Sequence, residues 1–129
     1  MFSYTIHPSR RRIEVQLGAL TSGSELVDGM QELLGDPSFD PAYGILIDIR
    51  SLERAPSVAE LAEFANFVRA HAVTPGARRA FVTSSPVFYE AAVLFTRLAK
   101  GTVVSYRVFR SLTAAEEWLE APRPETRGA

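Results

Sequence analysis

The residues best placed for chemistry in this 129-residue chain follow an apolar segment near its middle. Asp48 and Arg50 close that segment, and Ser51 and Ser57 belong to the polar stretch behind it. A carboxylate, a guanidinium and hydroxyls in one loop can bind an anion or a protein partner, and Ser57 could accept a phosphate group. The alternatives are an ion pair of Asp48 with Arg50 or Arg79, and a helix cap for Ser57.

A second polar cluster, Thr83, Ser84 and Ser85, closes a later apolar segment. The carboxyl ends of neighbouring parallel strands meet at one edge of a sheet, so this cluster would lie beside the loop at 50–57. The two loops together offer hydroxyls, an arginine and two helix N-termini. This predicts a rim that binds an anion or a partner, with two ordinary capped helices as the alternative.

The sequence holds no constellation that predicts an enzyme. His7 and His71 are the only histidines, and their positions do not have metal-ligand spacing. There is no cysteine, no glycine-rich phosphate loop and no serine nucleophile elbow. We therefore predict a non-enzymatic protein with no catalytic residue, no metal and no cofactor.

A strand and a helix position the central polar loop. The segment Gly44–Arg50 alternates between two faces, and one face carries Ile45, Ile47 and Ile49. Such alternation predicts a strand with one buried and one partly wet face. Ser57 followed by Glu60 is the capping box of a helix whose apolar stripe runs from Val58 to Ala72.

The same criteria predict the other elements. Strands are expected at 2–7, 12–20, 77–83 and 102–109, and helices at 22–34, at 87–100 and from Thr113 to Leu119. The order β-β-α-β-α-β-α-β-α predicts a single α/β domain with a five-stranded, mostly parallel sheet, an N-terminal antiparallel hairpin and four helices. Because the strands alternate polar and apolar residues, we expect the helices mainly on one face.

Two of the predicted helices carry more aromatic residues than one core-facing stripe requires: Phe64, Phe67, Phe88, Tyr89 and Phe95. A helix that is apolar nearly all round is buried on more than one side. These side chains could therefore be plain core, the face of a homodimer, or a cleft for a small lipid-like ligand between the helices that begin at Ser57 and Val87.

Composition bounds the class of protein. The apolar fraction of 47% and the charged fraction of 22% are ordinary for a globular domain. The net charge of −1 gives no overall field that attracts nucleic acid, so we expect no nucleic-acid partner. No apolar run approaches the roughly 20 residues of a membrane span. The absence of cysteine fits a cytoplasmic protein. We expect one domain over 1–121 and a flexible C-terminal tail over 122–129.

Several segments, in this order, resemble the STAS superfamily, the fold of bacterial anti-sigma-factor antagonists, and in particular its small single domains that are grouped with CRAL-TRIO domains. The segments are Gly18–Thr21, Asp36–Pro41, Ile47–Arg50 and Val108–Leu119, after a hairpin start. The resemblance covers nearly the whole chain to Leu119.

The resemblance implies a bacterial, cytoplasmic regulatory domain that acts by protein–protein interaction. Antagonists of this superfamily carry a phosphorylatable serine at the N-terminus of the helix after the central strand, and Ser57 stands at about that place. Pro56 precedes it here, where the family usually has aspartate. The function we expect is therefore an interaction or signalling module acting through Arg50–Ser57, with a carrier or sensor of a small apolar ligand as the alternative.

Overall fold

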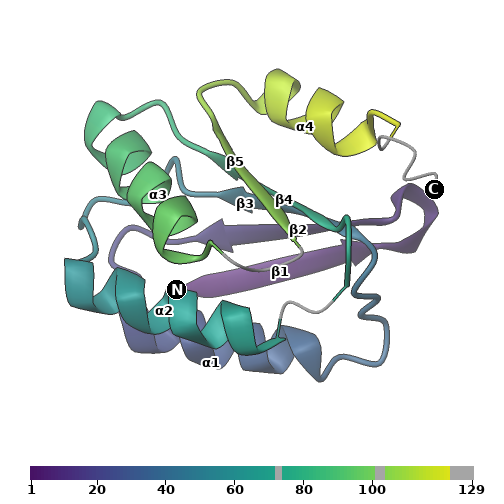
Figure 1. The fold of residues 1–129 in the computed structure, drawn as a ribbon, viewed down its shortest axis with the longest axis horizontal. Helices are drawn as coiled ribbons and strands as arrows, with labels where there is room; N and C mark the ends of the chain where they lie inside the picture. Colours follow the sequence, from purple (N-terminus) through teal and green to yellow (C-terminus); the bar gives the residue numbers. More distant parts are fainter. Residues whose placement is uncertain (72–73, 101–103, 123–129) are drawn as a thin grey trace.

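A five-stranded sheet forms the centre of the protein (Figure 1). The computed structural model describes residues 1–71, 74–100 and 104–122. The strands are β1 (Phe2–His7), β2 (Arg12–Leu17), β3 (Gly44–Asp48), β4 (Arg78–Val82) and β5 (Ser105–Phe109). They lie in the sheet in chain order, with β1 antiparallel to β2 and β2 to β5 parallel. The predicted α/β fold class and the antiparallel start are confirmed.

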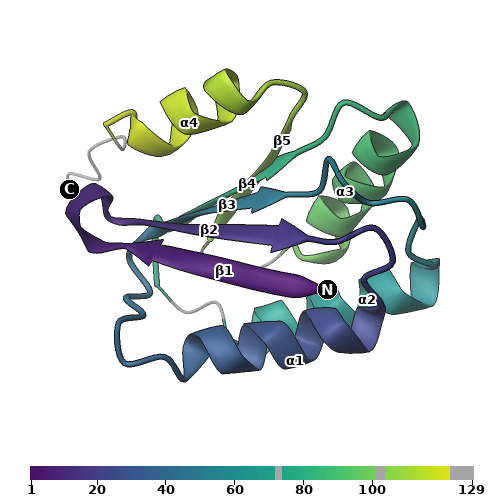
Figure 2. The ribbon, with the colours of Figure 1, turned by 180° about the vertical axis from the view of Figure 1, so that it is seen from behind.

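The distribution of the helices follows from this strand order. Successive crossovers from β2 to β5 all step in the same direction, and right-handed crossovers then place every connecting helix on one face. These helices are α1 (Gly23–Leu34), α2 (Val58–His71) and α3 (Pro86–Leu98). Helix α4 (Leu112–Glu120) follows the last strand and covers the other face, opposite α1 and α2 in both views (Figures 1 and 2). Helices therefore lie mainly on one face, as predicted.

The larger hydrophobic core lies between the sheet and α1 to α3. Alternate strand residues point into it, and their side chains are less than a tenth exposed: Ile13, Val15, Leu17, Ile45, Ile47, Ile49 and Phe81. The strand alternation read from the sequence thus marks this face of the sheet. The helices complete the core with α1, α2 and α3 residues that include Leu33, Ala65 and Phe95.

A smaller core joins α4 to the opposite face of the sheet. It contains Leu46, Ala80, Val82 and Ala115. Two buried arginines hold the helix at its C-terminal half. Arg12 pairs with Glu116 and Glu120, at 3.4 and 2.5 Å, while Arg78 donates to the backbone oxygens of Trp118 and Ala121, at 2.5 and 3.0 Å.

Helix α4 begins earlier than the sequence predicts. The sequence predicts a helix from Thr113, but α4 starts at Leu112, and the Oγ of its cap, Ser111, accepts from the amide of Ala114. The predicted strand start at 102–103, the helix end at Ala72 and the tail beyond Pro122 lie outside the described residues. Within the described ranges, none of the helices has the length and apolar character needed to cross a bilayer.

Candidate functional site

The loops that follow β2, β3 and β4 meet at the carboxyl end of the sheet. We call residues 18–23, 48–58 and 83–87 the carboxyl-end rim. The amide of Glu53 donates to the carbonyl of Ala19 at 2.9 Å, which joins the first two loops. The amide of Ile49 donates to the carbonyl of Val82 at 3.0 Å, which joins the second loop to β4. The two polar loops predicted as a site therefore emerge side by side.

Asp48 and Arg50 form a bidentate ion pair on this rim. Arg50 Nε donates to Asp48 Oδ1 at 3.0 Å, Nη2 donates to Oδ2 at 2.8 Å, and the Arg50 amide also donates to Oδ1. The hydrogen bonds from the Arg50 side chain lower the pKa of the Asp48 carboxyl despite its partial burial. Of the two pairings that the sequence allowed, Arg50 is the one formed. Arg79 is buried and donates to the carbonyl of Tyr43 at the other end of β3.

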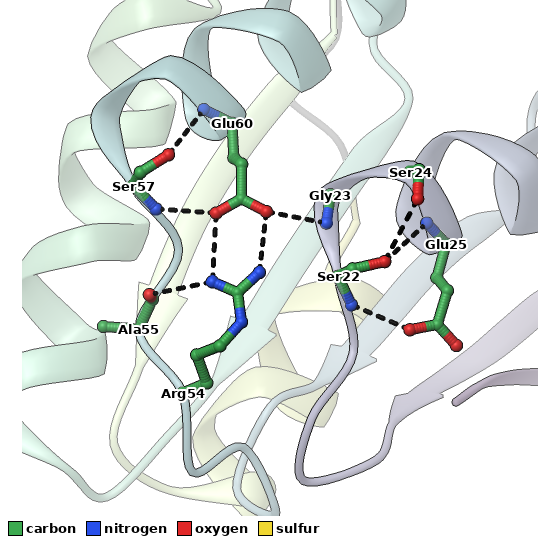
Figure 3. A network of polar contacts seen from close by, with 8 residues as sticks. All are labelled: Ser22, Gly23, Ser24, Glu25, Arg54, Ala55, Ser57 and Glu60. Atoms are coloured by element: carbon green, nitrogen blue, oxygen red, sulfur yellow. Dashed lines mark hydrogen bonds and ion pairs between the residues drawn. The ribbon is translucent and has the colours of Figure 1, made fainter.

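Ser57 caps α2, and the predicted capping box is present (Figure 3). Its Oγ accepts from the amide of Glu60 at 3.1 Å, and the Glu60 carboxylate accepts from the amide of Ser57 at 2.9 Å. The same carboxylate accepts two hydrogen bonds from Arg54, at 3.1 and 2.7 Å, and one from the amide of Gly23 at 3.0 Å. These donors, Arg54 first, hold the pKa of Glu60 far below its usual 4.5.

Glu60 thereby joins the N-termini of two helices. Gly23 is the first residue of α1, and Glu60 lies in the first turn of α2. A Cβ at position 23 would lie 3.0 Å from Glu60 Cγ, so the absence of a side chain permits this approach. Sequence reasoning found the Ser57–Glu60 pair from its spacing. It missed Arg54 and Gly23, because no local pattern signals a contact between positions 37 residues apart.

The hydroxyls of the third loop have local structural partners. Thr83 is buried, and its Oγ1 accepts from the amide of Ser85 at 3.2 Å. The Oγ of Ser85 accepts from the amide of Phe88 and caps α3. Ser84 and Ser51 are exposed beside these caps. The structure thus places all the predicted rim residues at one edge, with the Ser57, Thr83 and Ser85 hydroxyls engaged in local caps and turns.

Exposed aliphatic side chains occur in all three parts of the same rim. Leu20 lies in the loop after β2, and Val58 and Val87 lie in the first turns of α2 and α3; their side chains are 70, 65 and 63% exposed. Met1, 73% exposed, lies beside the first of these loops, because its carbonyl accepts from the amide of Gly18 at 2.7 Å. These four are the exposed large hydrophobic residues of the described chain. The sequence prediction had assigned Val58 to the buried stripe of its helix, which is wrong.

The aromatic residues singled out from the sequence lie in several environments. Phe64 and Phe95 are buried, with ring centroids 5.3 Å apart. Phe67 stacks on Phe64 at 6.4 Å. Phe88 is partly buried against the larger core, and the ring of Tyr89 lies 4.1 Å from the guanidinium of Arg110. Phe64 and Phe95 are therefore core residues, and the five side chains do not form one continuous outer face.

A cavity of about 60 Å³ lies beneath the rim, between the sheet and α1 to α3. Its lining is entirely apolar and includes Phe64, Phe88 and Phe95, with Leu52 and Pro56 contributed by the rim. The volume corresponds to about two water molecules, but a water needs polar partners that this lining lacks. The cavity is thus suited to apolar atoms.

Comparison with known proteins assigns no family to this chain. Comparisons with protein-family models, with curated proteins and with solved structures found no match to this chain.

Over residues 1–71, 74–100 and 104–122, no group of three or more histidine, aspartate or glutamate residues is arranged to hold a metal ion. His7 lies 3.4 Å from Glu14, and His71 stacks on Phe67, so the two histidines occupy separate sites.

Proposed function

We propose that this protein is a non-enzymatic interaction or signalling module that binds a protein partner through its carboxyl-end rim. The observation that carries the proposal is the exposure of Leu20, Val58 and Val87, one from each part of the rim, on the edge that also holds the charged loop at 50–57. Contiguous exposed apolar surface rimmed by polar groups marks interaction sites in many proteins. Apolar residues at the centre of a patch with charges at its margin are also the usual anatomy of a protein interface.

The resemblance to bacterial STAS domains supports a cytoplasmic regulatory role for the same rim. Ser57 is exposed and caps the helix after the central strand, the place where antagonists of that superfamily are phosphorylated. A phosphate on Ser57 would add negative charge beside the Glu60 carboxylate and compete for Arg54. Phosphorylation would then weaken the bridge from Glu60 to Gly23 and change the shape of the rim.

The test compares three proteins immobilised on resin and exposed to an extract of the source cells. They are the wild type, the rim variant Leu20→Ser/Val58→Ser/Val87→Ser, and a control with three exposed residues changed elsewhere, Glu32→Ser/Arg97→Ser/Glu117→Ser. We expect a protein that wild type and control retain equally and the rim variant loses. Retention of the same proteins by all three would contradict the proposal, as would retention of none. Native mass spectrometry of the wild type shows whether that partner is a second copy.

A second candidate function rests on the apolar cavity. A carrier or sensor would bind a small apolar ligand between α2 and α3, where Phe64, Phe88 and Phe95 line the space. Ligand sites usually measure about 300–1,000 Å³, so α2 and α3 would have to separate to admit a lipid-sized molecule. Native mass spectrometry of freshly purified protein tests this function: a bound mass of lipid size supports it, and a bare chain contradicts it.

A further inference from the structure

The end of the sheet opposite the rim carries a concentration of positive charge. A 3₁₀ turn, η1 (Pro8–Arg10), connects β1 to β2, and three consecutive arginines, Arg10, Arg11 and Arg12, end this turn and begin β2. Three glutamates lie near Arg12, so the positive charge available at this end is that of Arg10 and Arg11. We call Arg10, Arg11 and Arg12 the arginine turn.

The three arginines have different surroundings. Arg12 is 2% exposed, and its charge is neutralised by Glu116 and Glu120 of α4 and by Glu14 at 3.9 Å. Arg10 and Arg11 are exposed, and no carboxylate of the described residues lies within ion-pair distance of either guanidinium. Two cations at the arginine turn therefore remain available to an external anion.

A hollow adjoins these cations. Its volume is about 540 Å³, and it is lined by Arg10, Arg11, Arg12, Ala42, Gly44, Leu119 and Glu120. This volume falls within the range of about 300–1,000 Å³ that is usual for small-molecule sites. Gly44 shapes the hollow, because a Cβ at that position would lie 3.1 Å from Leu119 Cδ2. The walls thus combine guanidinium groups with the apolar surface of Leu119 and Ala42.

We propose that this arginine hollow binds a small organic phosphate. The phosphate group contacts Arg10 and Arg11, and the organic part lies against Leu119. Guanidinium groups match phosphate oxygens in planar, paired hydrogen bonds, and a phosphate monoester carries close to the two negative charges that the two cations can neutralise. Glu120 also lines the hollow, and its carboxylate is 2.5 Å from Arg12, which it shares with Glu116 and Glu14, so the phosphate is assigned to Arg10 and Arg11 and away from Glu120.

The chemistry of the hollow favours a single phosphate over a nucleic acid. A polymer needs cations spaced along its backbone. Here the available cations are two, and the acidic residues Glu14, Glu116 and Glu120 lie around the neighbouring Arg12. The phosphate monoester could be a free metabolite or the headgroup of a lipid, since both present the same dianion.

The test uses sn-glycerol 3-phosphate, which is phosphatidic acid without its two acyl chains. Its binding to the full chain is measured by isothermal titration calorimetry at low salt, where exposed charges are least screened. The turn variant Arg10→Gln/Arg11→Gln is compared with a control that removes two positive charges from α3 and the residues after it, Arg97→Gln/Lys100→Gln. We expect the turn variant to bind at least about tenfold more weakly than wild type, and the control to match wild type.

Vesicles distinguish the two sources of phosphate. Co-flotation is measured with phosphatidylcholine vesicles that contain or lack phosphatidic acid. Flotation that needs both the phosphatidic acid and the two arginines assigns a lipid headgroup. Calorimetric binding without flotation assigns a free phosphate. Equal binding by the turn variant, or binding to neither probe by the wild type, overturns the proposal. Thermal unfolding of both variants checks that the fold is intact.

Discussion

Glu60 shows how much one side chain decides at the rim. Its carboxylate accepts hydrogen bonds from the amides of Gly23 and Ser57 and from the guanidinium of Arg54. The four hydrogen bonds that this carboxylate accepts explain the depressed pKa of Glu60. They also fix the relative position of two helix N-termini. The charged form is therefore the one that stabilises the fold.

We predict that Glu60→Gln destabilises the protein in a pH-dependent way. Glutamine keeps the shape but loses the charge, so the free energy of unfolding at about pH 7 should fall by about 1–2 kcal/mol. A depressed folded-state pKa contributes stability above the ordinary value of 4.5 and loses it as the pH falls toward the folded-state value. Urea denaturation at about pH 7 and about pH 3 should show the two proteins converging in acid.

A constant difference between wild type and Glu60→Gln across this pH range would contradict the electrostatic account. It would indicate that packing, and not charge, makes the side chain important. Glu63→Gln on the same helix is the matched control, because Glu63 is exposed. Its effect should be small at both pH values.

Arg11 is the one non-glycine residue with a positive φ in the described chain, at 53°. The left-handed conformation costs an L-residue about 1–2 kcal/mol, whereas glycine adopts it freely. Against this, Arg11→Gly loses a contact between the guanidinium and the ring of Tyr43, 5.9 Å away, worth about 0.5–1 kcal/mol.

The net expectation for Arg11→Gly is a free energy of unfolding that stays equal or rises by up to about 1 kcal/mol. Binding of sn-glycerol 3-phosphate should weaken at the same time. Chemical denaturation and calorimetry on the same sample measure both quantities. A clear loss of stability would show instead that Arg11 serves the fold.

At the scale of the element, α1 depends on a close approach to β1. Gly29 lies in the middle of the helix, and a Cβ there would lie 2.3 Å from the ring of Phe2. Glycine is a poor helix former, so its presence at this position follows from packing and not from helix propensity.

We therefore predict different outcomes for two glycine substitutions at α1. Gly29→Ala should lower the free energy of unfolding by about 1–3 kcal/mol, because the ring of Phe2 must move. Gly35→Ala should have little effect, since the backbone there has φ −87° and the nearest atom to a new Cβ is 3.6 Å away. Thermal unfolding of both variants measures the contrast. A stabilising Gly29→Ala would mean that helix propensity outweighs the contact.

At the scale of the whole molecule, the apolar cavity leaves part of the larger core unfilled. Ala92 is buried and lines it. Ala92→Val adds two carbon atoms, worth about 1.6 kcal/mol if they fill the void, against about 0.6 kcal/mol of lost helix propensity. We predict a net gain of about 1 kcal/mol in the free energy of unfolding by urea denaturation.

A loss of stability in Ala92→Val would mean that the space is already filled in solution, as it would be by a bound apolar molecule. The control is Ala70→Val, which has the same propensity cost on the exposed side of α2. It should destabilise slightly, because no cavity is filled there.

Several features of this protein follow from its sequence alone. Alternating isoleucines in 44–50 predict a strand with one buried face, because side chains alternate along a strand wherever it lies. Ser57 and Glu60 predict a helix start, since both partners of a capping box belong to one turn. The chain order of strands and helices predicts the mostly parallel sheet, and the polar–apolar alternation along the strands predicts helices mainly on one face.

The tertiary structure decided which residues contact one another. The link from Glu60 to Gly23, the exposure of Val58, the cavity at Ala92 and the burial of Arg12 depend on residues far apart in the chain. Local periodicity and spacing carry no information about such contacts, because it is the packing of whole elements that brings their side chains together. The polar residues of the rim could be named from the sequence, because they follow predicted strands. The exposed apolar residues of the rim and the arginine hollow appear only in the fold.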